Sequence, residues 1–160
     1  MYQYGRPDFY YYQRLNQSVQ QAANLIQEAV QGERKDEQFY NYLISVAPTA
    51  EEKDIITSIR NDEMKHNQLF RDIYRNLTGQ EVQTNESPSY QEPKSYLAGI
   101  KEAFFGELSA VEDYRKIRAF FQNFYYRDIL YEIITDEQKH ADKYNFILNK
   151  NIAKKVGINI

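Results

Sequence analysis

The sequence predicts an all-α fold, a four-helix bundle of two antiparallel helix hairpins joined by a long crossover. Apolar residues recur at spacings of three and four along most of the chain, which is typical of the buried face of a bundle helix. The second half of the chain repeats the first after a shift of 74 residues, without a gap. One long stretch of loop-forming residues, 78–93, separates the two halves.

The expected helices follow from the periodicity and from its interruptions by Pro and Gly. They lie at about residues 13–47, 49–77, 93–121 and 124–150. Pro48 separates the first two helices, and Thr49 with Glu52 has the spacing of a capping box at the start of the second. The predicted organisation is an aromatic N-terminal tail, the bundle and a C-terminal tail, at 1–12, 13–150 and 151–160.

The length of the loop indicates how the hairpins join. A helix of about 28 residues is about 42 Å long. The roughly 15 residues of the loop can reach about 50 Å when extended. The loop can therefore run the full length of the bundle, which would bring the equivalent levels of both hairpins together.

Ionisable residues interrupt the apolar stripes at equivalent places in both halves. The second and fourth helices each carry a Glu-x-x-His pair, and the first and third helices each carry a glutamate after a glycine. These candidate metal ligands are Glu33, Glu63, His66, Glu107, Glu137 and His140. A spacing of three places both members of a Glu-x-x-His pair on one helix face.

Helix geometry predicts that these residues share one level. Two residues of an antiparallel hairpin lie level when their midpoint falls at the turn. Glu33 and Glu63 have their midpoint at Pro48, and Glu107 and Glu137 have theirs at the second turn. Each glutamate is about 14 residues, or roughly 21 Å, from its turn, which is the middle of the bundle.

Six ionisable groups in a core would be costly without compensation. Two divalent metal ions would neutralise the four carboxylates. Carboxylate and imidazole ligands together suit iron, with manganese and zinc as alternatives. This arrangement is also the one described for di-iron carboxylate bundles, with one Glu from each of two helices and Glu-x-x-His from the other two.

The segments GERKDEQFY, DEMKH, GELSAVEDY and DEQKH resemble the ferritin-like di-iron carboxylate superfamily, especially its rubrerythrin and bacterioferritin branches. The resemblance implies a site for two iron ions. The glutamates of the first and third helices resemble terminal ligands, and those of the Glu-x-x-His pairs resemble bridging ligands. Each histidine resembles the imidazole ligand of one metal.

The resemblance also implies an oxidoreductase that reacts ferrous iron with O2 or peroxide. The chain has no cysteine and so no rubredoxin-like domain. We therefore expect a separate electron donor to supply the electrons. Ala110 stands where rubrerythrins have a further glutamate, which weighs against a rubrerythrin-type peroxidase. Met64 stands where bacterioferritin has its haem-ligating methionine, although an ordinary helix contact is the simpler interpretation.

Two other functions remain open at this point. One is iron binding or storage, against which the short C-terminal segment argues because it cannot form the fifth helix of ferritin cages. The other is a non-enzymatic bundle that uses metals as staples and acts as a binding protein. The family habit favours a homodimer.

Further residues are candidates for supporting the ligands. Tyr40 and Tyr114 follow the glutamates of the first and third helices by two turns, so each could donate a hydrogen bond to a ligand carboxylate or simply pack in the core. Asp36 and Glu37 break the repeat and could form an extra ligand, an iron entry group or a solvated face.

Aspartates precede both histidines by four residues. Asp62 before His66, and Asp136 before His140, could each accept the ring N–H that a metal leaves unused. The alternative is an exposed carboxylate. Lys65 and its repeat partner are expected in solvent.

Composition excludes several classes of protein. The net charge of −3 offers no case for nucleic acid or an anionic membrane as a partner. The sequence contains no stretch of the roughly 18 apolar residues that a membrane span needs, and its start lacks the features of a secretory signal. We therefore expect a cytoplasmic protein. The aromatic tail is expected to dock on the bundle or on a second subunit, or to be poorly ordered; its residues are Tyr2, Tyr4, Phe9, Tyr10, Tyr11 and Tyr12.

Overall fold

The computed structural model describes residues 9–83 and 91–158, with the backbone alone described at 9–16 and 33–37. Four helices make up the bundle: α1 (Phe9–Val46), α2 (Ala50–Thr78), α3 (Tyr96–Ala119) and α4 (Phe124–Lys155). The described ranges contain no strand. The predicted all-α fold is confirmed. The aromatic tail residues lie outside the described positions or have undescribed side chains.

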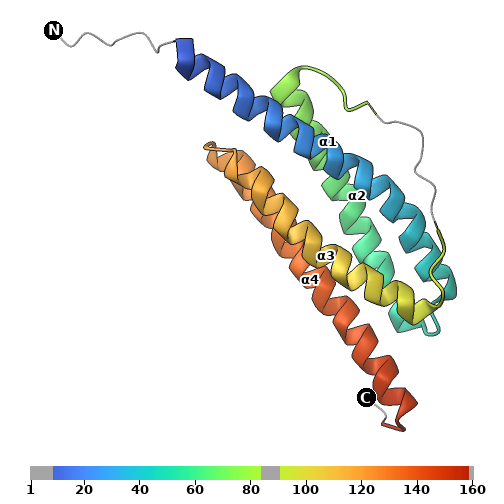
Figure 1. Ribbon diagram of the computed structural model, residues 1–160. Coiled ribbons are helices and arrows are strands. Elements are labelled where there is room, and N and C mark those ends of the chain that lie inside the picture. The colour runs from blue at the N-terminus through green and yellow to red at the C-terminus, as the bar shows by residue number, and fades with distance from the viewer. Residues whose placement is uncertain (1–8, 84–90, 159–160) are drawn as a thin grey trace.

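The helices form two hairpins that lie against each other (Figure 1). Within the hairpins α1 packs on α2 and α3 on α4, and between them α1 contacts α3 and α2 contacts α4. The end of α2 and the beginning of α3 lie at opposite ends of the bundle in Figure 1. The connection between them therefore covers the length of the bundle, as the loop length predicts.

The helix ends follow local chemistry. The side chains of Thr49, Ser95 and Asn123 each accept a hydrogen bond from a backbone N–H in the first turn of α2, α3 and α4. Gly79 ends α2 in the left-handed region at φ 71°. The fourth helix continues five residues beyond the expected 150, because neither Pro nor Gly interrupts it before Gly157.

Two apolar clusters fill the bundle, one on either side of the polar residues. The first cluster includes Ile26, Val30, Phe70, Ile73, Ile117, Leu130 and Ile133. The second cluster includes Leu43, Ile56, Ile59, Ile100, Tyr144 and Ile147. Along α2 and α4 the Glu-x-x-His pairs lie between these clusters, so the polar residues occupy one layer that apolar side chains enclose from both ends.

Glu52 marks a polar junction that the sequence did not reveal. Its carboxylate is buried and accepts hydrogen bonds from Thr49 Oγ1 at 3.0 Å, Tyr96 Oη at 2.7 Å and Asn151 Nδ2 at 3.1 Å. The backbone N–H of Glu52 donates to Thr49, so half of the predicted capping box is present. The carboxylate instead joins α2 to the first turn of α3 and to α4.

Candidate metal centre

Carboxylates and imidazoles from three helices converge in the polar layer. One ligand atom from each of Glu63, Glu107, Glu137 and His140 lies within 4.8 Å of the others. The Nδ1 atom of His66 lies 3.0 Å from Glu137 Oε1 and 3.4 Å from Glu63 Oε2. All five side chains are buried. The predicted level of these residues is thus observed wherever their side chains are described.

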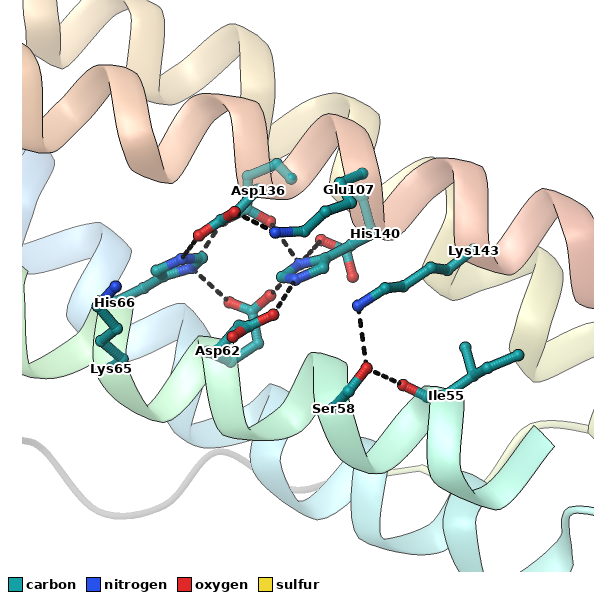
Figure 2. A network of polar contacts seen from close by, with 12 residues as sticks. Ile55, Ser58, Asp62, Lys65, His66, Glu107, Asp136, His140 and Lys143 are labelled. Carbon is teal, nitrogen blue, oxygen red and sulfur yellow. Dashed lines mark hydrogen bonds and ion pairs between the residues drawn. The ribbon is translucent and has the colours of Figure 1, made fainter. Parts of the chain in front are cut away.

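The two histidines lie side by side and present the same ring atom to the carboxylates (Figure 2). Their ring centroids are 5.9 Å apart. The Nδ1 atom of His140 lies 2.9 Å from Glu63 Oε1 and 3.7 Å from an oxygen of both Glu107 and Glu137. Both Nδ1 atoms therefore point toward the centre of the cluster.

The other ring nitrogen of each histidine points to an aspartate on the opposite helix. Nε2 of His66 is 3.2 Å from Asp136 Oδ2, and Nε2 of His140 is 3.1 Å from Asp62 Oδ2. An ionised carboxylate only accepts hydrogen bonds, so Nε2 carries the hydrogen in both rings. In a neutral imidazole this leaves the Nδ1 lone pair free for a metal. The predicted acceptors are correct, but each serves the histidine of the other helix.

Four buried atoms at the centre make no hydrogen bond of good geometry, although His66 Nδ1 lies 3.0 Å from Glu137 Oε1 and His140 Nδ1 lies 2.9 Å from Glu63 Oε1. They are Glu63 Oε1, His66 Nδ1, Glu137 Oε1 and His140 Nδ1. Buried polar atoms are almost always paired, and unpaired ones are costly. All four are atoms that bind metals, and all four face one another. The donor set therefore fits a metal centre built from carboxylate oxygens and imidazole nitrogens.

Protons are the alternative to metal at these positions. Burial lowers the pKa of both histidines, but the surrounding carboxylates outweigh it. Glu137 and Glu63 raise the pKa of His66 to about 10, and Glu107, Glu137 and Glu63 raise that of His140 to about 12. Without metal, both imidazoles are therefore cations at neutral pH, and a divalent ion must displace their Nδ1 protons.

The glutamates respond in opposite directions. Burial raises the pKa of Glu107 well above its usual value, and the negative charges of Glu63 and Glu137 add to this effect. Burial also acts to raise the pKa of Glu137, but its close contacts with both histidines and with Glu107 lower it to about 2. Of these two carboxylates, Glu137 therefore keeps its negative charge and Glu107 holds a proton more readily.

The two tyrosines that were predicted to support the ligands make different contacts. Tyr40 Oη donates to Glu107 Oε1 at 3.2 Å, so its carboxylate partner belongs to the other hairpin. The Tyr114 ring packs on Phe70 with centroids 4.8 Å apart. The side chain of Glu33, the sixth predicted ligand, lies outside the described positions, although its backbone is part of α1.

The remaining candidates are placed as follows. Asp36 and Glu37 have undescribed side chains. Ala110 packs against the first apolar cluster and supplies no ligand. Met64 is 57% exposed, so it is no core contact.

Lys65 and Lys139 are exposed, as expected, and each contacts a carboxylate: Lys65 reaches from α2 to α4, whereas Lys139 pairs within α4. Lys139 Nζ lies 2.5 Å from Asp136 Oδ1, and Lys65 Nζ lies 2.6 Å from Glu132 Oε1 across the α2–α4 interface. Hydrogen bonds from Lys139 and His66 outweigh burial and lower the pKa of Asp136, which keeps this acceptor ionised.

A sequence profile that describes rubrerythrin matches residues 24–148 of the chain. The match includes all of α2 and α3, most of α1 and α4, and the whole polar layer. The chain belongs to the rubrerythrin family. This membership confirms the resemblance that the four segments around the glutamates indicate. No helix in the described part of this rubrerythrin-family chain is both long and apolar enough to cross a bilayer.

Individual proteins are also similar to this chain, one in sequence and two in fold. YhjR, an uncharacterised protein of Bacillus subtilis (strain 168), is 28% identical over 116 residues, which are 72% of this chain and 79% of that protein. A bacterioferritin of Desulfovibrio desulfuricans matches with a TM-score of 0.74 at 19% identity, over 89% of this chain and 85% of its own. A hypothetical protein of Pyrococcus furiosus matches with a TM-score of 0.71 at 20% identity, over 81% of this chain and 89% of its own. The ferritin-like fold is thus confirmed.

Proposed function

We propose that this chain is a di-iron oxidoreductase that reacts ferrous iron with O2 or peroxide. The observation that carries the proposal is the orientation of the two imidazoles. Both turn Nδ1 into a buried carboxylate cluster and hold Nε2 against an aspartate of the opposite helix. A purely structural pair of buried histidines has no need to turn both Nδ1 atoms onto the same carboxylates without well-formed hydrogen bonds at the centre.

The proposed ligands divide between two metal positions. His66 and His140 would each hold one iron ion, and Glu63 and Glu137, whose oxygens approach both rings, would lie between the two ions. Glu107 would complete the position near His140. The repeat assigns Glu33 the same role near His66.

The chain's own residues would prepare the site for this chemistry. Iron ions bound here would supply electrons to the oxidant. The aspartates hold the imidazoles in the tautomer that exposes Nδ1, and the apolar clusters on both sides exclude bulk water. Glu107 is placed to hold a proton on its carboxylate, because burial and neighbouring charge raise its pKa. A separate electron donor would return the site to its reduced state. We also propose that the chain forms a homodimer.

Anaerobic loading with ferrous iron tests the proposal. We expect about two iron ions per chain by elemental analysis, as the ligand count implies. Stopped-flow absorbance after mixing with air-saturated buffer or with peroxide should then report oxidation, and the faster reaction identifies the oxidant. Many iron ions per chain after repeated additions would instead support storage.

The Glu63→Ala variant should lose both iron and oxidation. Glu132→Ala, which removes an exposed carboxylate from α4, is the matched control and should retain both. A wild-type chain that stays free of metal after reconstitution would overturn the proposal. So would a Glu63→Ala variant that oxidises ferrous iron as the wild type does.

A further inference from the structure

A second polar site lies on the outside of the α3–α4 hairpin. A groove of about 540 Å³ opens there, lined by Arg115, Arg118, Ala119, Arg127, Tyr131, Ile134, Thr135 and Gln138. No carboxylate lines it. Its size is that of pockets that bind small organic molecules, which are roughly 300–1,000 Å³. A bare inorganic ion would leave most of it empty.

The groove gathers three guanidinium groups. Throughout the described ranges, none of Arg115, Arg118 and Arg127 forms an ion pair with a carboxylate. Many of the other charged side chains around the bundle are paired, such as Lys116 of the same helix with Asp113 at 2.7 Å. Three unpaired guanidinium groups in one hollow favour an anion as its occupant.

Backbone contacts hold two of these groups in place. Arg118 Nε donates to the carbonyl oxygen of Arg127 at 3.0 Å, and Arg127 Nη1 donates to the carbonyl oxygen of Phe121 at 3.2 Å. These bonds leave other N–H groups of both side chains available. A guanidinium that is already oriented loses less conformational freedom when it binds an anion.

An aromatic surface completes the groove. Tyr131 is 59% exposed, and the Arg118 guanidinium carbon lies 5.7 Å from the centroid of its ring. Exposed aromatic rings stack on the flat faces of nucleobases with little dependence on the base. The groove therefore offers stacking beside a cluster that matches phosphate.

The internal repeat shows that the fold does not require this cluster. In the α1–α2 hairpin, the positions of Arg115, Arg118 and Arg127 are taken by Asn41, Ile44 and Lys53. The two hairpins have the same architecture and the same metal-binding pattern. The arginines are thus a feature of one hairpin, additional to the bundle.

From these observations we propose that the α3–α4 groove binds a nucleotide, with its phosphate on the three arginines and its ring system against Tyr131. This site is separate from the polar layer and goes beyond the proposed oxidation of iron. Isothermal titration calorimetry of the full-length protein with adenosine monophosphate (AMP), a weak metal chelator, tests it at low salt. Arg115→Gln is the decisive variant, because Arg115 is exposed and forms no hydrogen bond or ion pair with the residues that the structure describes.

We expect Arg115→Gln to weaken AMP binding about tenfold or more, as for loss of a hydrogen bond between charged groups. Lys116→Gln removes the same charge one residue away, outside the groove, and should change affinity less than about twofold. Inorganic phosphate and adenosine should each bind more weakly than AMP. Circular dichroism of both variants should match the wild type.

Several outcomes would overturn the proposal. These are the absence of AMP binding at millimolar concentration, equal effects of the two variants, and inorganic phosphate binding as tightly as AMP. Tighter binding of poly-glutamate than of AMP, if it also depended on Arg115, would overturn the proposal too. It would identify an acidic polypeptide as the occupant of the groove.

Discussion

Nε2 of His66 on α2 donates a hydrogen bond to Asp136 on α4, 3.2 Å away, although Asp62 precedes the histidine by one turn on its own helix. Asp62 in turn accepts from His140 at 3.1 Å. The two contacts cross the α2–α4 interface in opposite directions. Each helix therefore orients the imidazole of the other, and the proposed site depends on the register between the hairpins.

Asp136→Asn should weaken metal binding. The amide can offer its N–H to Nε2, which would place the ring hydrogen on Nδ1, where a metal would bind. Removal of such a partner typically lowers metal affinity about 10- to 100-fold. Competition with a chromophoric chelator at neutral pH measures the change. Asp142→Asn, at an exposed aspartate of the same helix, should leave affinity unchanged, and equal affinities for the two variants would contradict the assigned role.

The metal-free protein should become less stable as pH rises above about 6.5. The carboxylates hold the pKa of His66 at about 10 and that of His140 at about 12, against an unfolded value of 6.5. Between these values the folded state binds protons that the unfolded chain has lost. The free energy of unfolding therefore falls with rising pH, by up to about 1.4 kcal/mol per pH unit for each such proton.

Urea unfolding at pH 6, 8 and 9.5 measures this dependence. The stabilisation should be fully present below pH 6.5 and lost as the pH rises through the folded-state values. Loading with metal should reduce the slope, because metal replaces the Nδ1 protons. A metal-free protein whose stability rises over this range would show that the histidines are not held as cations.

Tyr40→Phe should alter the Glu107 carboxylate without emptying the site. The variant loses the 3.2 Å hydrogen bond to Glu107 Oε1. A hydrogen bond of this kind contributes roughly 1–3 kcal/mol, so we expect slower ferrous oxidation with metal content preserved. Stopped-flow rates and elemental analysis check this. Tyr125→Phe, at an exposed tyrosine of α4, is the control, and equal rates for the two variants would assign Tyr40 to packing alone.

Gly99→Ala should destabilise the fold, because α1 and the loop before α3 approach this residue closely. An added Cβ would lie 2.7 Å from Leu43 Cδ2 and 3.0 Å from Pro93 Cγ. Overpacking of this kind costs about 1–3 kcal/mol. Gly106→Ala, where a Cβ meets nothing within 4 Å, should instead stabilise α3 by up to about 1 kcal/mol. Chemical denaturation compares them, and equal changes would contradict the close approach.

The bundle and most of the proposed site could be predicted from the sequence because both depend on helical periodicity. On α4 the predicted stripe, Leu130, Ile133, Glu137, His140 and Tyr144, is buried at every position. The level of Glu107 and Glu137 follows from their distance to one turn. The junction at Glu52 was not predicted, because its partners Tyr96 and Asn151 are far away in the chain and carry no pattern.

The sequence by itself determined the helices, their buried faces and the carboxylate and imidazole groups that meet in the core. Spacing along one helix decides which residues share a face. Only the tertiary structure decided which helix each face meets. It pairs Tyr40 with Glu107 and His66 with Asp136. It also brings three arginines together in one groove. The reason is physical: periodicity sets direction around a single helix axis, whereas partners across an interface depend on how two axes pack and on their register.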